Sequence, residues 1–575
     1  MKYLLRIALC LLTFGLLTSL QAQPLLQYQI SGVSNPDIKK NIDNTLTNMV
    51  KSLQSPLDAD DVTRFRQESQ KKVQEAILPY GFFKPQVTTS IVKDKKGKPI
   101  IDYHVTLGKK ITIKAVYLKL SGEGANTKPF IKIKENFPIK VGQRLQIPKY
   151  NKAKDNLFDK ASFLGYFQSK MLNKKIKIDL KNKTAVINIA FDTGPRYRIG
   201  KTTFNKTPFA ESFLRRFLDY KDGQKYKASS IENTQQNFTL GRYFEKVVVN
   251  APSTKAKNLI IPVSIQLHTL PKIQYMGGVG YGTDTGPRAT GGITWRWVNQ
   301  YGHRFRTFVR ASQSNNQATL NYDIPAKNPV TDFYSLEAGA GELNQSSGSS
   351  EVLRTSISHT MQYTSDWTQI VALTYLNEHY DLTDRPKTTA KLIYPSIEWD
   401  YLFKDKELNP NNGYKLTFKL AGAPNKLSSH RGFIQAYAMS KFLYTFKPTH
   451  TRFIVRGSLG ETFINNINNL PLSMQLFAGG SQSIRGYAFN SIGPGHNMFT
   501  ASGEIQQKLF GDLYIAAFYD TGNVANSDLY SKRFIGFGPG LVYLSPVGSI
   551  EITYAKAVTS IDKPWKLQFS MGPTL

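Results

Sequence analysis

The sequence predicts a multidomain protein in which three tandem α+β domains precede a C-terminal, 16-stranded antiparallel transmembrane β-barrel. Three observations support this fold class. The chain begins with an export signal, and a glycine–aromatic signature then recurs three times at a near-constant spacing. After residue 270 apolar and polar residues alternate, which is the pattern of a β-strand with two different faces.

The first 22 residues have the features of a secretory signal peptide. Lys2 and Arg6 lie before a short apolar run, which ends in small and polar residues. The run is shorter than the roughly 20 apolar residues that a membrane-spanning helix needs. A buried N-terminal helix is the alternative interpretation, but polar sequence follows at once. The single cysteine, Cys10, lies in this segment, so the mature chain has no thiol for a disulfide or a cysteine-based zinc site.

Three glycines mark a repeat in the N-terminal half: Gly81, Gly165 and Gly241. They are 84 and 76 residues apart; aromatic residues follow each of them, and a helical pattern of apolar residues precedes each. Glycine just past a helix is an expected stop, because it adopts the left-handed conformation without steric penalty. A predicted strand opens each unit and two more follow the glycine, at 86–93 and 99–107 in the first unit and at 175–180 and 184–191 in the second. We therefore expect a signal peptide at 1–22, domains at 23–109, 110–194 and 195–270, and a barrel at 271–575.

Charge is distributed unevenly along the chain. Residues 23–270 contain 44 Lys and Arg against 20 Asp and Glu, a net charge of +24, whereas residues 271–575 contain 28 against 21, a net charge of +7. Export and the lack of a recognition-helix, zinc or RNA-binding motif argue against nucleic acid as a partner. Three interpretations remain for the basic half: it contacts anionic lipid headgroups, it contacts an acidic partner, or it is simply a solvated surface.

The last 305 residues have the pattern of a transmembrane barrel. Apolar and polar residues alternate in segments such as 414–420, 550–554 and 565–571, so that one face can meet lipid and the other a polar lumen. A soluble sandwich alternates too, but export and the abundance of aromatic residues, 30 Tyr and 34 Phe, favour the barrel. At about 10 residues per strand and a similar length per connection, roughly 16 strands fit.

Three motifs occur together and in order near the C-terminus. They are Phe477–Tyr487, which contains Ile484-Arg485-Gly486-Tyr487, then Phe518–Val524 and Gly536–Leu541. The motifs resemble those of the BamA/TamA superfamily of outer-membrane assembly and secretion proteins. The three repeats resemble its POTRA domain, the polypeptide-transport-associated module. Within the superfamily, three repeats and the sequences at both ends of the barrel resemble the TamA family, the outer-membrane part of the translocation and assembly module.

The resemblance implies a role for the loop that contains Arg485, Gly486 and Tyr487. In the family this loop folds back into the barrel, and its arginine meets acidic residues of the inner wall; motif matching identifies these as Asp520 and Glu504. The contact would lock the loop and the strands in register. An arginine can enter a lumen only if its charge is paired, and the planar guanidinium suits bidentate contact with a carboxylate. An exposed loop arginine is the alternative.

The first predicted barrel strand is rich in glycine. It contains Gly277, Gly278, Gly280 and Gly282, and glycine weakens a strand and lets backbones approach closely. In this family the first and last strands form a weak seam. The resemblance therefore implies loose pairing with the last strand, which contains Phe569 and Gly572, and an opened seam would template an incoming β-hairpin. The alternative is that these glycines only accommodate the curvature of the barrel.

The sequence contains no motif of an enzyme, a metal site or a cofactor site. Its eight histidines are scattered, none belongs to an H-E-x-x-H segment, and there is no G-x-S-x-G or P-loop motif. Templating of hairpins would need neither a cofactor nor a nucleotide. We therefore expect no catalytic residue, no metal and no cofactor.

The leading functional hypothesis is a factor that inserts or secretes autotransporters and other β-barrel clients through a lateral gate. The resemblance implies a barrel in the lipid of a Gram-negative outer membrane, periplasmic POTRA domains, and a TamB-like, inner-membrane-anchored partner bound by the first POTRA domain. Unfolded clients could add to an exposed edge strand of these domains, unless the domains only act as spacers. The alternatives for the whole chain are a two-partner-type pore that secretes one dedicated protein, and a passive channel.

Overall fold

The computed structural model describes residues 26–53, 59–93, 99–284, 286–345, 348–382, 387–407, 409–425, 432–546 and 548–572. The predicted signal peptide at 1–22 and the last three residues lie outside these ranges. The chain divides into two compact units. The first contains residues up to 201 together with 221–230 and 251–263, and the second contains the other parts of the third repeat and the whole barrel. No helix in the described ranges is long and apolar enough to cross a membrane.

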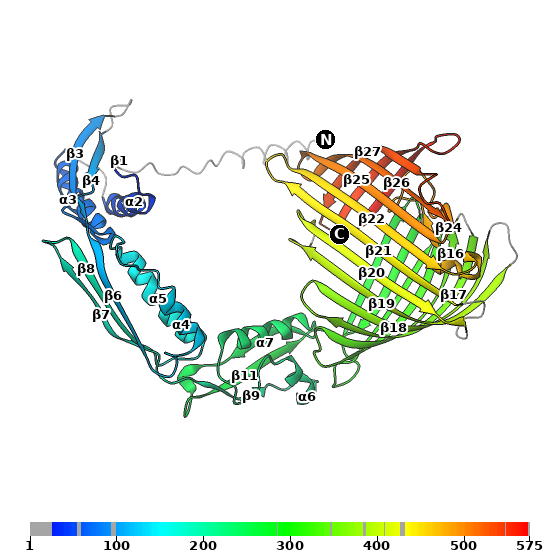
Figure 1. The fold of residues 1–575 in the computed structure, drawn as a ribbon, viewed down its shortest axis with the longest axis horizontal. Coiled ribbons are helices and arrows are strands. Elements are labelled where there is room, and N and C mark those ends of the chain that lie inside the picture. The colour runs from blue at the N-terminus through cyan, green and yellow to red at the C-terminus, as the bar shows by residue number, and fades with distance from the viewer. Residues whose placement is uncertain are drawn as a thin grey trace, which may run out of the picture. The chain divides into compact units, whose positions relative to one another are not determined.

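The first repeat is a three-stranded mixed sheet covered by two helices (Figure 1). Asn35 begins the first helix, because its side-chain oxygen accepts hydrogen bonds from the backbone N–H groups of Asp37 and Ile38. The sheet order is β1-β4-β3, with β1 parallel and β3 antiparallel to β4. The elements are β1 (Gln27–Ser31), α2 (Pro36–Lys51), α3 (Ala59–Ile77), β3 (Gln86–Lys93) and β4 (Pro99–Thr106), with the short pair β2 (Phe82–Phe83) and β5 (Lys109–Lys110).

The second repeat has the same arrangement, with sheet order β6-β8-β7. Its core contains the fully buried Phe130, Leu157 and Phe191. Strand β7 begins five residues before the predicted start at 175, because residues 170–174 place the apolar Met171 and Leu172 side by side and include a register irregularity, so apolar and polar residues do not alternate there. The elements are β6 (Thr112–Ser121), α4 (Lys128–Glu135), α5 (Ile147–Phe163), β7 (Lys170–Asp179) and β8 (Thr184–Asp192).

The third repeat has sheet order β10-β11-β9, and the boundary between the two compact units passes through it. In the part that belongs to the second unit, the ring of Phe209 packs against Trp297 of the barrel at 5.3 Å, and the Tyr243 hydroxyl donates to the Gly302 carbonyl at 2.6 Å. The elements are β9 (Arg198–Phe204), α6 (Glu211–Leu214), α7 (Ala228–Leu240), β10 (Phe244–Asn250) and β11 (Ile260–Thr269).

The three signature glycines do not all act in the same way. Gly81 and Gly165 have φ angles of +76° and +83°, as a left-handed helix stop requires. The prediction is wrong for Gly241, because the left-handed residue there is Arg242, with φ of +58°. At Gly241 a Cβ atom would lie 2.7 Å from a ring carbon of Phe217, so close packing rather than turn geometry requires glycine.

We predict that Gly81→Ala destabilises the first repeat by more than about 2 kcal/mol, since left-handed strain adds to steric overlap. The new Cβ would lie 2.0 Å from the Leu145 carbonyl oxygen. The matched control is Gly142→Ala, where φ is +82° but no atom lies within 4 Å, so only the strain of roughly 1 kcal/mol remains. Hydrogen exchange of the α3 amides in the whole protein measures the difference. Equal protection in the two variants would contradict the overlap argument.

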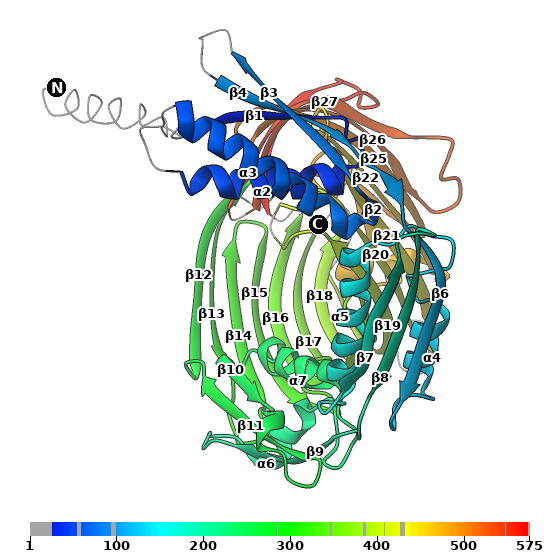
Figure 2. The same ribbon diagram turned by 90° about the vertical axis from the view of Figure 1, so that its left-hand side faces the viewer.

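Sixteen antiparallel strands form the barrel, as the sequence predicts, and the sheet order follows the chain order (Figure 2). In this nearly closed arrangement the backbone groups of neighbouring strands bond to one another, which is how a β-structure can exist in lipid. The strands are β12 (Ile273–Gly282), β13 (Gly286–Trp295), β14 (Arg304–Ser312), β15 (Asn315–Pro325), β16 (Asp332–Gln345), β17 (Gly348–Gln362), β18 (Trp367–Leu382), β19 (Thr388–Lys404), β20 (Gly413–Ala423), β21 (Phe433–Phe446), β22 (Thr451–Phe463), β25 (Asn497–Phe510), β26 (Leu513–Ala525), β27 (Phe534–Ser545), β28 (Gly548–Ala557) and β29 (Trp565–Gly572).

The two faces of the barrel wall differ as the alternation predicts. On β20 the apolar Leu416, Phe418 and Leu420 are exposed, whereas the polar residues between them are partly buried. On β28 Ile552 is exposed and Thr553 is buried. This is the reverse of a soluble protein, and it means that the apolar side chains point outward to lipid.

Candidate functional site in the barrel lumen

A loop between β22 and β25 carries the first of the C-terminal motifs. It is flanked by a two-stranded sheet, β23 (Leu476–Ala478) and β24 (Ile492–Gly495). The loop packs on the lumen side of the wall, because Ser502, Glu504 and Asp520, which face it, are buried, while their neighbours Ile505 and Tyr519 are exposed on the opposite face.

Arg485 lies at the centre of this site and is 2 % exposed. Its Nε and Nη2 atoms donate to the two carboxylate oxygens of Asp520 at 2.8 and 2.9 Å, which is a bidentate pair. Its Nη1 atom donates to Glu504 at 2.5 Å and to Glu551 at 3.0 Å. The guanidinium carbon lies 3.5 Å from the centre of the Phe518 ring. Three carboxylates and an aromatic face thus surround a single guanidinium.

Strand register explains why these groups converge. Ser502 is paired with Asp520 and Glu504 with Phe518 across β25 and β26, so all four side chains share the lumen face. The Ser502 hydroxyl donates to Asp520 at 2.5 Å, which fixes the carboxylate. A buried charge is tolerated only when it is paired and hydrogen-bonded, and here both conditions hold.

The sequence comparison of motifs identified Asp520 and Glu504 but not Glu551. Glu551 lies on β28, and its only sequence signal is its position on the polar face of an alternating strand. Arg456 of β22 was also missed; its guanidinium lies 3.8 Å from Asp520. Each of these residues alternates like an ordinary lumen residue, so the pattern alone does not single it out.

The other two motif residues tie the loop to further strands. The Gly486 N–H donates to the side-chain oxygen of Gln568 on β29 at 2.9 Å. The Tyr487 hydroxyl donates to the Ile535 carbonyl of β27 at 3.2 Å, and its ring packs against Phe534. A Cβ atom on Gly536 of β27 would lie 2.0 Å from the Arg485 carbonyl oxygen, so the loop backbone rests directly on that glycine.

The predicted seam residues lie at the two ends of the barrel sheet. Gly277, Gly278, Gly280 and Gly282 are on β12, and Phe569 and Gly572 are on β29. In the described parts of these two strands no backbone hydrogen bond joins them, in contrast to the ladders between all neighbouring strands. The Phe569 N–H donates instead to the Thr283 hydroxyl at 3.3 Å.

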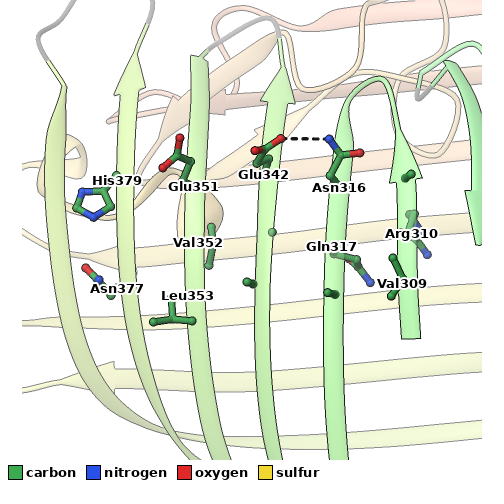
Figure 3. A pocket seen from close by; sticks show the side chains of 14 residues that line it. Val309, Arg310, Asn316, Gln317, Glu342, Glu351, Val352, Leu353, Asn377 and His379 are labelled. Atoms are coloured by element: carbon green, nitrogen blue, oxygen red, sulfur yellow. Dashed lines mark hydrogen bonds between the residues drawn. The ribbon is translucent and has the colours of Figure 1, made fainter. Parts of the chain in front are cut away.

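A separate cavity of about 700 Å³ is lined by strands β14 to β18. Figure 3 shows Glu342, Glu351 and His379 around it, with Asn316 donating to Glu342 at 3.1 Å. None of these strands carries a residue of the Arg485 site. Within the part of the chain that the structure describes, no group of three or more His, Cys, Asp or Glu side chains could hold a metal ion.

Comparison with known proteins agrees with this architecture. A family model for the Omp85 superfamily domain matches residues 280–575, and a model for POTRA domain TamA domain 1 matches residues 27–107. The chain is similar in fold to a crystal structure of BamA from Haemophilus ducreyi lacking POTRA domains 1-3, with 17 % identity and a TM-score of 0.65 over 80 % of this chain and 99 % of that one. A match to CdiB from Acinetobacter baumannii covers 94 % of this chain and 99 % of that one, with 14 % identity and a TM-score of 0.48.

The Omp85 match covers more than half of the chain, including the Arg485 loop and the strands that hold it. The same match shows where the protein is located. The barrel lies in the outer membrane, and the α+β repeats lie in the periplasm. The chain therefore belongs to the Omp85 superfamily, as an outer-membrane assembly and translocation protein that is not an enzyme and whose first repeat is a POTRA domain of the TamA type.

Proposed function

We propose that this protein inserts or secretes autotransporters and other β-barrel clients by opening a lateral gate between β12 and β29. The observation that carries the proposal is the contrast between this seam and the rest of the barrel. Every other pair of neighbouring strands has a backbone ladder, whereas β12 and β29 are the two ends of the sheet order. A strand edge with free backbone groups is a template for another strand.

The exposure of β12 supports this role. Tyr275 is 74 % exposed, and neighbouring positions on both faces of the strand are exposed as well. Its glycines at 277 and 278 leave the edge without bulky side chains, so an incoming client strand could approach closely. Pairing with the client and burial of its apolar face in lipid would supply the free energy, without a nucleotide.

The loop that contains Arg485, Gly486 and Tyr487 acts as a lock in this proposal. Its contacts with Asp520 and Glu504 hold β25 and β26 in register, so that opening is confined to the seam. The signature glycines Gly81, Gly165 and Gly241 belong to three POTRA domains, which we place at 23–109, 110–194 and 195–270, followed by the barrel at 271–575.

The first POTRA domain is the proposed binding site for a TamB-like, inner-membrane-anchored protein. This assignment is supported by the match of residues 27–107 to POTRA domain TamA domain 1. Strand β3 lies at an edge of its sheet, and Ile91 and Val92 on it are 43 % and 45 % exposed. An extended partner segment can add to such an edge through backbone hydrogen bonds. The same match favours assembly over secretion of one dedicated protein or passive diffusion.

A disulfide across the seam tests the proposal. The rings of Tyr281 and Phe569 are 6.4 Å apart, and the only natural cysteine is Cys10, so Tyr281→Cys with Phe569→Cys creates a single pair. We expect the oxidised protein to lose client assembly and the reduced protein to regain it. The measurement compares two quantities between the oxidised and reduced proteins: the abundance of barrel proteins in the outer membrane, and the abundance of secreted proteins.

The matched control is Leu336→Cys with Ile357→Cys, which are exposed partners on the paired strands β16 and β17. Oxidation of this pair should leave assembly unchanged. Normal assembly by the oxidised seam variant would overturn the gate. Loss of one secreted protein alone would instead identify a dedicated exporter.

A further inference from the structure

The lumen loop reaches the first hairpin of the barrel as well as its last strands. Asp284 lies in the turn that follows β12, and one of its carboxylate oxygens accepts two hydrogen bonds from Ser481 of the loop. The backbone N–H donates at 2.8 Å and the hydroxyl at 2.7 Å. A carboxylate that receives two such bonds is held more strongly than by a neutral contact. The beginning of the loop is therefore attached to the β12 side of the seam.

The loop is attached to the other side of the seam a few residues later. The Gly486 N–H donates to Gln568 of β29, whose side chain is 1 % exposed, at 2.9 Å. The preceding residue, Arg485, binds Glu551 of β28 at 3.0 Å. Residues 480–486, which we call the seam strap, thus connect the first hairpin with the last two strands.

The backbone of the seam strap is closely fitted at both ends. Gly480 and Gly486 have φ angles of +103° and +93°, which favour glycine. A Cβ atom on Gly480 would lie 3.0 Å from the bound oxygen of Asp284, and one on Gly486 would lie 3.0 Å from the Ala557 nitrogen. Both contacts therefore depend on a loop backbone that passes tightly over the wall on each side.

Direct hydrogen bonding between the described residues of the two sides is sparse by comparison. The hydrogen bond from Phe569 N–H to the Thr283 hydroxyl is 3.3 Å long, and no backbone ladder is present in the described parts of β12 and β29. The indirect connection through the strap contains shorter bonds and a charged acceptor. It therefore contributes more to closure than the direct contact does.

We propose that the seam strap holds the gate closed and that Asp284, Ser481 and Gln568 are its positioning residues. This inference rests on the proposed function, because it names the contacts that must break before a client strand can enter. The strap is released at its Asp284 end. There it is held by one partly buried carboxylate, whereas the Arg485 end is buried among three carboxylates.

The rate of disulfide formation between Tyr281→Cys and Phe569→Cys, with copper phenanthroline in proteoliposomes, measures closure directly. We expect Asp284→Ala to slow trapping roughly tenfold, because two hydrogen bonds to a charged group are lost. Asp284→Asn keeps an acceptor oxygen but loses the charge, so it should trap at a rate between those of the parent and Asp284→Ala. Ser481→Ala removes only the hydroxyl donor and should be intermediate, which keeps the test usable if Asp284→Ala folds poorly.

The matched control is Gln345→Ala. It removes another tether of the same loop, the 2.8 Å bond from Asn490, at the end of β16 and away from the seam. It should trap at the parent rate. The strap would be overturned if disulfide formation in both Asp284→Ala and Ser481→Ala ran at the parent rate. It would also be overturned if Gln345→Ala slowed disulfide formation as much as Asp284→Ala does. Slow trapping by the strap variants, together with normal client assembly by the oxidised Tyr281→Cys and Phe569→Cys protein, would support the strap and overturn the lateral gate, so the two failures can be told apart.

Discussion

Arg485→Ala is expected to destabilise the folded barrel by about 3–5 kcal/mol, because it leaves buried carboxylates without their counter-charge. Asp520 is 0 % exposed and Glu504 is 8 % exposed, and both lose a guanidinium at hydrogen-bond distance. Heating in detergent, followed by gel mobility that separates folded from unfolded barrel, measures the loss. Arg485→Lys should recover only part of it, because an ammonium group cannot form the bidentate pair with Asp520 while also reaching Glu504.

The control for this substitution is Arg533→Ala, which removes an exposed arginine in the connection between β26 and β27. Its effect should lie within about 0.5 kcal/mol of zero, as for other surface positions. If Arg485→Ala melted at the same temperature as Arg533→Ala, the charge cluster would not stabilise the barrel.

Gly536→Ala is expected to displace the lumen loop without removing any charged side chain of the barrel wall. The new methyl group would lie 2.0 Å from the Arg485 carbonyl oxygen and 3.1 Å from its carbonyl carbon, so the loop or strand β27 must move. Overpacking of this kind costs about 3 kcal/mol or more, because both atoms belong to fitted backbone. Protease sensitivity of the loop should rise, and client assembly should fall with it.

Gly503→Ala is the matched control, since it adds the same methyl group on β25, two strands away from β27, where no atom lies within 4 Å. It should leave loop protection and assembly unchanged. If the loop stayed equally protected in Gly536→Ala, the contact between Gly536 and the Arg485 backbone would not position it.

The local patterns that predicted the fold depend on neighbours in the chain. Strands β3 and β8 begin at the predicted residues because apolar and polar positions alternate there within a few residues. Helix α3 ends before Gly81 for an equally local reason. Local patterns failed at Gly241, where contact with Phe217, 24 positions earlier in the chain, determines the residue. They were also imprecise at β7, whose first half pairs with β8 without alternating.

The sequence by itself determined the α+β repeats, the alternating strands of the barrel and the resemblance that points to Arg485, Asp520 and Glu504. Only the tertiary structure decided that Glu551 and Gln568 meet the same loop and that Asp284 binds its other end. Period and spacing are properties of nearby residues, whereas these contacts join positions 66 to 197 residues apart. Their proximity depends on the register and closure of sixteen strands, which no single segment encodes.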